Sequence, residues 1–211
     1  MNEIAMTLIT AWGALAAAAL SPGPNLVAVA SRGLGSGRRA ALSVTLGIAL
    51  GGFGWAILTA FGLGFLFETH PTLLRVLGLF GGAYLAWLGL KGWRSAFTGG
   101  TSDMSPKISA GFWNDLGYGF VVTATNPKVA LLWASLSTFV SGVTSSIMTT
   151  FIFAAVSSFV LLIIYGTYGL VFSTTGMRTV YARFGRATDA LFGTAFEILG
   201  LTMIFKSLRP T

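Results

Sequence analysis

The stretch Ser21-Pro22-Gly23-Pro24-Asn25 lies inside an apolar run that covers residues 7–31. An apolar run of about 20 residues is long enough to cross the hydrocarbon core of a membrane as a helix. Each proline removes a backbone donor and clashes with the preceding turn, so two prolines around a glycine should open this helix. In lipid, the freed backbone groups survive only where they face protein or a wet cavity. The stretch therefore predicts a membrane helix that is interrupted beside such a cavity.

Five further apolar runs follow the first one. The six runs cover residues 7–31, 40–65, 73–93, 112–139, 146–172 and 187–208. Charged residues make up only 9% of the 211 residues, whereas soluble domains carry about 25%, so lipid must surround much of the chain. The runs do not alternate as the strands of a membrane β-barrel do. We therefore expect an all-α membrane protein with six transmembrane helices in a single transmembrane domain, residues 1–211.

A second interruption, Thr125-Asn126-Pro127-Lys128, lies in the fourth apolar run. Pro22 and Pro127 are separated by half the length of the chain, so each half would contain three helices, the first of them broken. Because three is odd, the two halves must enter the membrane in opposite senses. The prediction is two inverted three-helix repeats, approximately residues 1–98 and 108–211, with the joining loop at 94–111. Ordinary proline kinks are the alternative, but they explain the paired spacing less well.

Matched broken helices in two such halves indicate a binding site near the middle of the membrane. The amino ends of half-helices offer amides to a carboxylate, and exposed carbonyls can hold an ammonium or a cation. We expect residues 22–25 to be non-helical and close to the second interruption. The predicted substrate-binding residues are Ser21, Pro22, Gly23, Pro24, Asn25, Asn126, Pro127 and Lys128.

Two charged residues, Lys128 and Glu197, lie near the centres of their predicted spans. A charge at that depth costs at least about 2.5 kcal/mol on insertion scales. Lys128 could bind a substrate carboxylate or hold the unwound carbonyls, and snorkelling to the membrane surface is the alternative. Glu197 is predicted to face the bundle interior near Lys128 or other polar groups and to take part in coupling. A neutral, hydrogen-bonded carboxyl is the alternative for Glu197, and headgroup-level or packing charges are expected for Asp115 and Asp189.

Basic residues are distributed unevenly between the predicted loops. One side carries Arg32, Arg38, Arg39, Lys91, Arg94, Lys107, Arg178, Arg183 and Arg186, and the other carries Arg75, Lys206 and Arg209. Cytoplasmic loops hold the basic excess, so both termini are predicted to lie outside the inner (plasma) membrane. This pattern explains the net charge of +7 through lipid headgroups and topology, and no nucleic acid partner is expected.

Several other functions are disfavoured by what the chain contains. It has no cysteine and a single histidine, His70, in a predicted loop, so no metal site or cofactor is expected. An intramembrane enzyme needs a nucleophile and a base at membrane depth, which this composition does not offer. The glycine pairs Gly47/Gly51 and Gly78/Gly82 have the spacing of close helix contacts. Packing within the chain is the simpler interpretation of these pairs, with a homodimer contact as the alternative.

The two interruptions together resemble those of the LysE/RhtB family of amino-acid exporters. The likeness includes Arg32-Gly33-Leu34-Gly35-Ser36-Gly37, Gly82-Ala83-Tyr84-Leu85 with Gly89, and Asn126-Pro127-Lys128, and it runs from about residue 10 to 205. It implies a proton-driven exporter of amino acids or their derivatives without a prosthetic group. Leu136-Ser137-Thr138-Phe139 departs from the Leu-Pro-Gln-Phe of many relatives, Gly52 stands where some carry a polar residue, and Glu197 is not a family hallmark.

The favoured hypothesis is a secondary active exporter of amino acids or amino-acid derivatives. Its substrate would bind between the first and fourth helices, and its partners would be a small solute, the lipid bilayer and a proton. The chain has no Walker motif, which argues against direct use of ATP. An exporter or channel for another small solute, or a membrane scaffold that transports nothing, are the alternatives.

Overall fold

The computed structural model describes residues 3–63, 69–98, 105–140 and 146–208. Within these ranges the chain forms helices and loops and no strand, which confirms the prediction of an all-α protein. The elements are α1 (Glu3–Leu20), α2 (Pro24–Ser36), α3 (Arg38–Leu58), the π-helical turn η1 (Thr59–Leu63), α5 (Pro71–Thr98), α6 (Phe112–Ala124), α7 (Pro127–Val140), α8 (Ile147–Phe172) and α9 (Thr175–Leu208).

Four helices in the described ranges are long and apolar enough to cross a membrane. They are Glu3–Leu20, Arg38–Phe61, Ile147–Phe172 and Thr175–Leu208. A helix the length of α2, α6 or α7 rises about 20 Å, less than the roughly 30 Å of hydrocarbon. Each of these three short helices therefore needs a second segment to complete a crossing. The arrangement of six spans in two inverted repeats stays a prediction.

The chain leaves the helical conformation at both proline motifs. Residues 21–23 separate α1 from α2, and Thr125 and Asn126 separate α6 from α7. The expectation that residues 22–25 are all non-helical is wrong for Pro24 and Asn25, which begin α2. Proline is well suited to the first turn of a helix, because the amide it lacks would have no partner there. The prolines thus start the second half-helices instead of lying in the gaps.

Glycines allow α3 and α6 to approach closely. A Cβ atom added to Gly47 of α3 would lie 2.0 Å from the carbonyl oxygen of Leu116, and one added to Gly119 of α6 would lie 2.1 Å from that of Val44. Such distances are far below van der Waals contact, so only glycine fits at either position. Gly51, one turn further along α3, faces Thr123 of α6 in the same way. The Gly47/Gly51 pair therefore serves helix packing within the chain.

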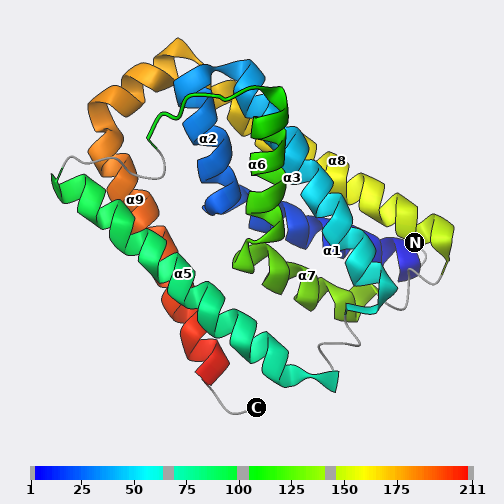
Figure 1. Cartoon of the computed structure of the whole chain (residues 1–211). Helices are drawn as coiled ribbons and strands as arrows, with labels where there is room; N and C mark the ends of the chain where they lie inside the picture. The colour runs from blue at the N-terminus through cyan, green and yellow to red at the C-terminus, as the bar shows by residue number, and fades with distance from the viewer. Residues whose placement is uncertain (1–2, 64–68, 99–104, 141–145, 209–211) are drawn as a thin grey trace.

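The helices α5 and α9 form a second closely packed pair and lie side by side in Figure 1. An added Cβ atom on Gly82 would lie 2.7 Å from the Gly200 carbonyl oxygen, and one on Gly89 would lie 2.9 Å from the Gly193 carbonyl oxygen. Small residues on both helices let their backbones touch, which is how helices associate in lipid. The α9 helix also begins at Thr175, well before the predicted start at 187, because its first turns are polar and escape a search for apolar runs.

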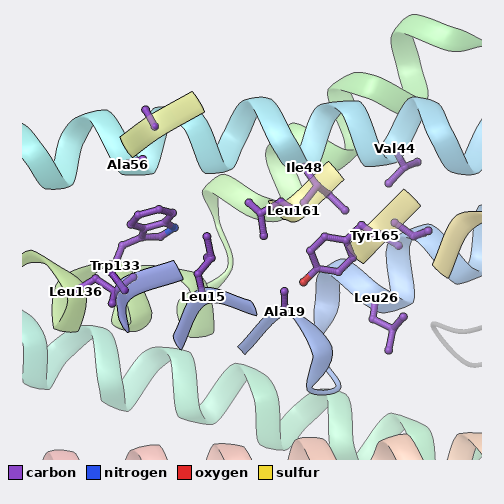
Figure 2. Close-up of a cluster of buried hydrophobic side chains, with 14 of the residues drawn as sticks. Leu15, Ala19, Leu26, Val44, Ile48, Ala56, Trp133, Leu136, Leu161 and Tyr165 are labelled. Carbon is purple, nitrogen blue, oxygen red and sulfur yellow. The ribbon is translucent and has the colours of Figure 1, made fainter. Parts of the chain in front are cut away.

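The main buried cluster surrounds the two interruptions. Its side chains come from α1, α2, α3, α7 and α8, and Figure 2 shows Leu15 and Ala19 of α1 facing Ile48 of α3 and Tyr165 of α8. Trp133 of α7 is fully buried there. The interruptions thus lie against a packed core and not against lipid.

Two arginines of α9 bind backbone groups at or near the ends of other helices. Arg178 at the start of α9 donates to the Gly33 carbonyl near the end of α2, at 3.3 Å. Arg186 donates to the carbonyls of Ala96 and Phe97 at the end of α5, both at 2.7 Å. Arg32, which the sequence suggests as a loop residue, lies within the last turns of α2. These contacts bring the basic segments of three different connections together.

Candidate functional site

Two buried asparagines join the interruptions directly. Asn126 Nδ2 donates to Asn25 Oδ1 at 3.1 Å, and each residue is only 3% exposed. The Asn126 side-chain oxygen also accepts from the Lys128 backbone amide at 3.1 Å. Asn126 therefore caps α7 at its amino end, with Pro127 in the first helical position, a combination that favours helix initiation. One side chain thus starts α7 and binds it to α2.

Lys128 extends from the first turn of α7 to the end of α1. Its Nζ donates to the carbonyl oxygens of Ala18 at 3.0 Å, Ser21 at 3.1 Å and Pro22 at 3.1 Å, and to the Ser21 hydroxyl. The last carbonyls of a helix have no partner within it, and they carry the negative end of the helix dipole. The ammonium satisfies them. Of the two roles expected for Lys128, the structure shows the holding of unwound carbonyls.

The ammonium of Lys128 is fully occupied in this conformation. An ammonium has three N–H donors and no acceptor, and four oxygens surround this one. Gly23 leaves the space that the side chain needs, because a Cβ atom there would lie 3.3 Å from Lys128 Nζ. A substrate carboxylate would therefore have to compete with the end of α1 for this group.

A small enclosed cavity of about 30 Å³ lies between the interruptions. It is lined by Leu15, Ala18, Ala19, Gly23, Asn25, Thr123, Asn126, Lys128, Val129, Leu132, Trp133, Leu161 and Tyr165. Thr123 is 1% exposed and Trp133 is not exposed at all, and neither the Thr123 hydroxyl nor the Trp133 indole nitrogen has a hydrogen-bond partner among the described residues. In Figure 2 the indole nitrogen lies on the side of Trp133 that faces Leu15. Two residues that line the cavity therefore each carry a buried polar atom without a partner among the described residues.

A larger, open cleft of about 420 Å³ lies on the other side of Lys128. Arg75 of α5 and Lys206 of α9 line this cleft together with Lys128, and none of the described residues that line it is acidic. Lys128 is the residue that lines both the cavity and this cleft. Its side chain therefore lies between the enclosed space and an open, cationic one.

The family model described as LysE type translocator matches residues 16–207. The chain belongs to this family. The resemblance seen in the two interruptions is thus confirmed, and it places the chain among membrane transporters.

Three curated relatives show how related chains are described. A cysteine/O-acetylserine efflux protein of Salmonella choleraesuis is 28% identical over 97% of this chain and 97% of its own length. A threonine efflux protein of Salmonella typhi is 27% identical over 89% of this chain and 92% of its own. A chemotactic transduction protein of Pseudomonas aeruginosa is 34% identical over 59% of this chain and 60% of its own. No solved structure matches the chain significantly.

Glu197 of this translocator lies on α9 where that helix touches α5. A Cβ atom on Gly89 of α5 would lie 3.1 Å from the Glu197 Cβ atom. Among the described residues, no hydrogen bond or ion pair joins Glu197 to Lys128, Asn25 or Asn126. The structure thus does not bring the two central charges together, and the coupling role of Glu197 stays a prediction.

The two other acids of the spans are buried packing charges, one of the two roles expected for them. Asp115 of α6 is fully buried and its Oδ1 lies 2.9 Å from Arg32 Nε of α2. Asp189 of α9 accepts from the hydroxyls of Ser95 at 2.8 Å and Tyr181 at 3.3 Å. These contacts fasten α6 to α2 and α9 to α5.

Among the polar and aromatic residues that line the cavity, sequence reasoning missed Thr123 and Tyr165, whereas Trp133 lies far enough inside its apolar run to be a cavity candidate. A threonine in an apolar helix is common, and tryptophan and tyrosine are expected throughout membrane helices. Thr123 lies within one or two turns of the Asn126-Pro127 motif, so nearness to the interruption was its one available signal. Tyr165 lies on α8, far from both motifs in the sequence, and no sequence signal indicated that it lines the cavity.

Proposed function

We propose that this translocator is a secondary active exporter of amino acids or amino-acid derivatives, and that the substrate binds where the two interruptions meet. The observation that carries the proposal is the cavity between the interruptions, whose lining residues Thr123 and Trp133 each have a buried polar atom without a partner among the described residues. Buried polar groups without partners cost about 1–3 kcal/mol each, and a bound solute with polar atoms would remove that cost. Family membership and the two efflux relatives support the same function.

The lining of the cavity suits a small amphipathic solute. One part is polar, with Asn25, Asn126 and the carbonyls that end α1, and the opposite part is apolar, with Leu15, Leu132 and Leu161. An amino acid has the same division, with an ammonium and a carboxylate at one end and a side chain at the other. A volume of about 30 Å³ has room for only about two or three water molecules, which is less than an amino acid needs. The cavity must therefore widen before a substrate enters.

The pairing of helices supports inverted repeats and alternating access. The third helix of each predicted half, α5 and α9, pack against each other, and so do the second helices, α3 and α8. The first helices meet at their interruptions. Contact between corresponding helices is what a two-fold axis in the membrane plane would give, and rocking of such halves is a common transport motion.

Proton coupling and a cytoplasmic location of the basic end complete the proposal. Glu197 is the one acid near the centre of a predicted span, and it lies in the α5–α9 contact, where a change in packing would alter its surroundings. The basic segments gathered at one end of the bundle support a cytoplasmic position for that end. Both termini would then face outward across the inner membrane.

The proposal is tested by transport with purified protein in lipid vesicles. Vesicles would be loaded with radiolabelled amino acids and derivatives, and exit would be followed with and without a pH gradient. Thr123→Val keeps the side-chain shape and removes the hydroxyl, so we expect transport to fall by about ten-fold, the worth of one hydrogen bond. Thr167→Val, at an exposed position of α8, is the matched control and should transport normally.

Each alternative function predicts a different result in this experiment. Exit of an unrelated solute in place of amino acids would identify an exporter or channel of another kind. Folded protein that moves none of the solutes would favour the membrane scaffold. Normal transport by Thr123→Val would show that the substrate does not bind in the cavity between the interruptions.

A further inference from the structure

We propose that the Lys128 ammonium occupies the binding place of the substrate's own ammonium, and that a substrate loads by displacing it. The inference rests on the proposed function, because it concerns the same cavity. It adds a substrate class, solutes with a primary ammonium and a carboxylate, and a switch that only such solutes operate.

The first argument is the chemistry of the oxygens around Lys128 Nζ. Three backbone carbonyls, of Ala18, Ser21 and Pro22, and the Ser21 hydroxyl surround the nitrogen, with the carbonyl distances at 3.0–3.1 Å. All four are neutral acceptors, and none is a carboxylate that would fix a cation by charge alone. They can accept hydrogen bonds from any group of the form R–NH₃⁺, because they contact only its N–H donors and not the rest of the molecule that carries it. The α-ammonium of an amino acid is such a group.

The second argument is the position of this oxygen cluster. Ala18 and Gly23, which flank the ammonium, also line the enclosed cavity that contains the unpartnered Thr123 and Trp133 groups. A solute in the widened cavity would therefore have its ammonium beside the same carbonyls. The Lys128 ammonium and the substrate ammonium cannot share them, since three N–H groups already use the four oxygens. Loading then requires that Lys128 leave.

The third argument is the place to which Lys128 can move. Its flexible stem borders the open cleft of about 420 Å³, so the side chain has space there. Arg75 and Lys206 are the other basic residues among the described residues that line that cleft, so an anion that enters with Lys128 would lower the repulsion between Lys128 and these cations. The substrate carboxylate is that anion. An amine without a carboxylate would fill the oxygen cluster but leave Lys128 unpaired, whereas an amino acid satisfies both sites.

The oxygen cluster is tested first without any transport. The Lys128→Ala variant would be purified as the full chain, and its thermal unfolding would be measured with and without ethylammonium. We expect ethylammonium at about ten times its dissociation constant to raise the midpoint of the variant by roughly 3–6 °C and to leave the wild-type protein unchanged. Tetramethylammonium, which has the charge but no N–H, should change neither protein. An equal effect of both cations, or none, would overturn the proposal.

Displacement is tested on the wild-type protein, which also covers the case of a variant that does not fold. The acylation of each lysine by a small amine-reactive reagent would be followed by mass spectrometry, with Lys91 and Lys107, which line neither the cavity nor the cleft, as internal references. We expect threonine to raise the rate at Lys128 several-fold over these references. Its N-trimethylated analogue lacks N–H donors and should not. An unchanged rate with threonine, or an equal rise with the analogue, contradicts displacement.

The outcomes separate this inference from the proposed function. Stabilisation by ethylammonium in a protein that exports no amino acid would retain the ammonium site and reject the exporter. Export of amino acids without stabilisation or faster acylation would retain the exporter and reject the displacement of Lys128.

Discussion

Lys128 shows what can and cannot be read from a sequence at the scale of one residue. Its charge in the middle of an apolar run is visible in the sequence and indicates a functional role. The choice between binding a substrate and holding carbonyls depends on Ser21 and Pro22, which lie more than a hundred positions earlier. No local pattern shows that these groups meet. Proximity across the fold decides the role, and only the structure supplies it.

The contacts of Lys128 predict that arginine cannot replace it. An ammonium is compact, whereas a guanidinium is planar and presents five donors in a fixed fork. Gly23 leaves space only for the lysine, because a Cβ atom added to this glycine would lie 3.3 Å from Nζ. We therefore expect Lys128→Arg to lose export as fully as Lys128→Ala, with both variants inserted at normal levels. Lys91→Arg, at a position that lines neither the cavity nor the cleft, is the control and should export normally, and an active Lys128→Arg would mean that charge alone suffices.

At the scale of the elements, sequence patterns located the helices well and their partners poorly. The apolar runs at 112–139 and 146–172 agree closely with α6 and α7 together and with α8, because burial in lipid needs long apolar segments. The two proline motifs marked the positions where helices end. The same patterns do not say which helices touch, since a glycine face fits any partner of similar shape. The pairing of α3 with α6, and of α5 with α9, came from the structure.

The close approach of α3 and α6 predicts opposite results for two similar glycines. In Gly47→Ala the new Cβ atom would meet the backbone of Leu116, so the helices must separate, at a cost of about 1–3 kcal/mol. In Gly54→Ala nothing lies within 4 Å of the new atom, and alanine favours the helix by up to roughly 1 kcal/mol. In detergent, the midpoint of thermal unfolding should be lower than that of the wild type for Gly47→Ala and higher for Gly54→Ala. Equal stability of the two would mean that α3 and α6 are not in backbone contact.

The position of Glu197 in the α5–α9 contact predicts a selective effect on coupling. Glu197→Gln keeps the size of the side chain and removes its titration. If Glu197 carries the proton, export should lose its dependence on the pH gradient while the thermal midpoint changes little. Export by vesicles with and without a gradient measures this directly. A variant that keeps its full response to the gradient would leave Glu197 as a packing residue beside Gly89.

For the whole molecule, the sequence predicted a helical membrane protein. The contacts between basic segments in the structure support the orientation that the sequence predicts. A small share of charged residues and long apolar runs suffice to indicate a helical membrane protein. The basic residues of three connections, far apart in the chain, lie together at one end of the bundle. Six spans with inverted halves remain a prediction, because four described helices meet the criteria of length and hydropathy for crossing alone.

The gathered basic end predicts the orientation of the whole chain. Short loops that are rich in Lys and Arg stay on the cytoplasmic side of the membrane. Arg38, Lys107 and Arg183 should therefore face the cytoplasm, with both termini outside. Fusions of alkaline phosphatase, which is active only outside, and of a fluorescent protein, which is bright only inside, would report each loop. Fluorescence is expected after residue 107 and phosphatase activity at both termini. An active phosphatase after residue 107 would invert the assignment.

The Lys128 ammonium has one more consequence, for the membrane in which the protein is embedded. If a proton gradient drives export, as proposed, the resting protein must not conduct protons, since any path for hydronium would discharge that gradient. The cavity between the interrupted helices is small, about 30 Å³, and the Lys128 ammonium lies beside it. Positive groups at a constriction exclude protons and other cations in water-conducting pores. The same group that holds the end of α1 would therefore oppose the leakage of protons through this space.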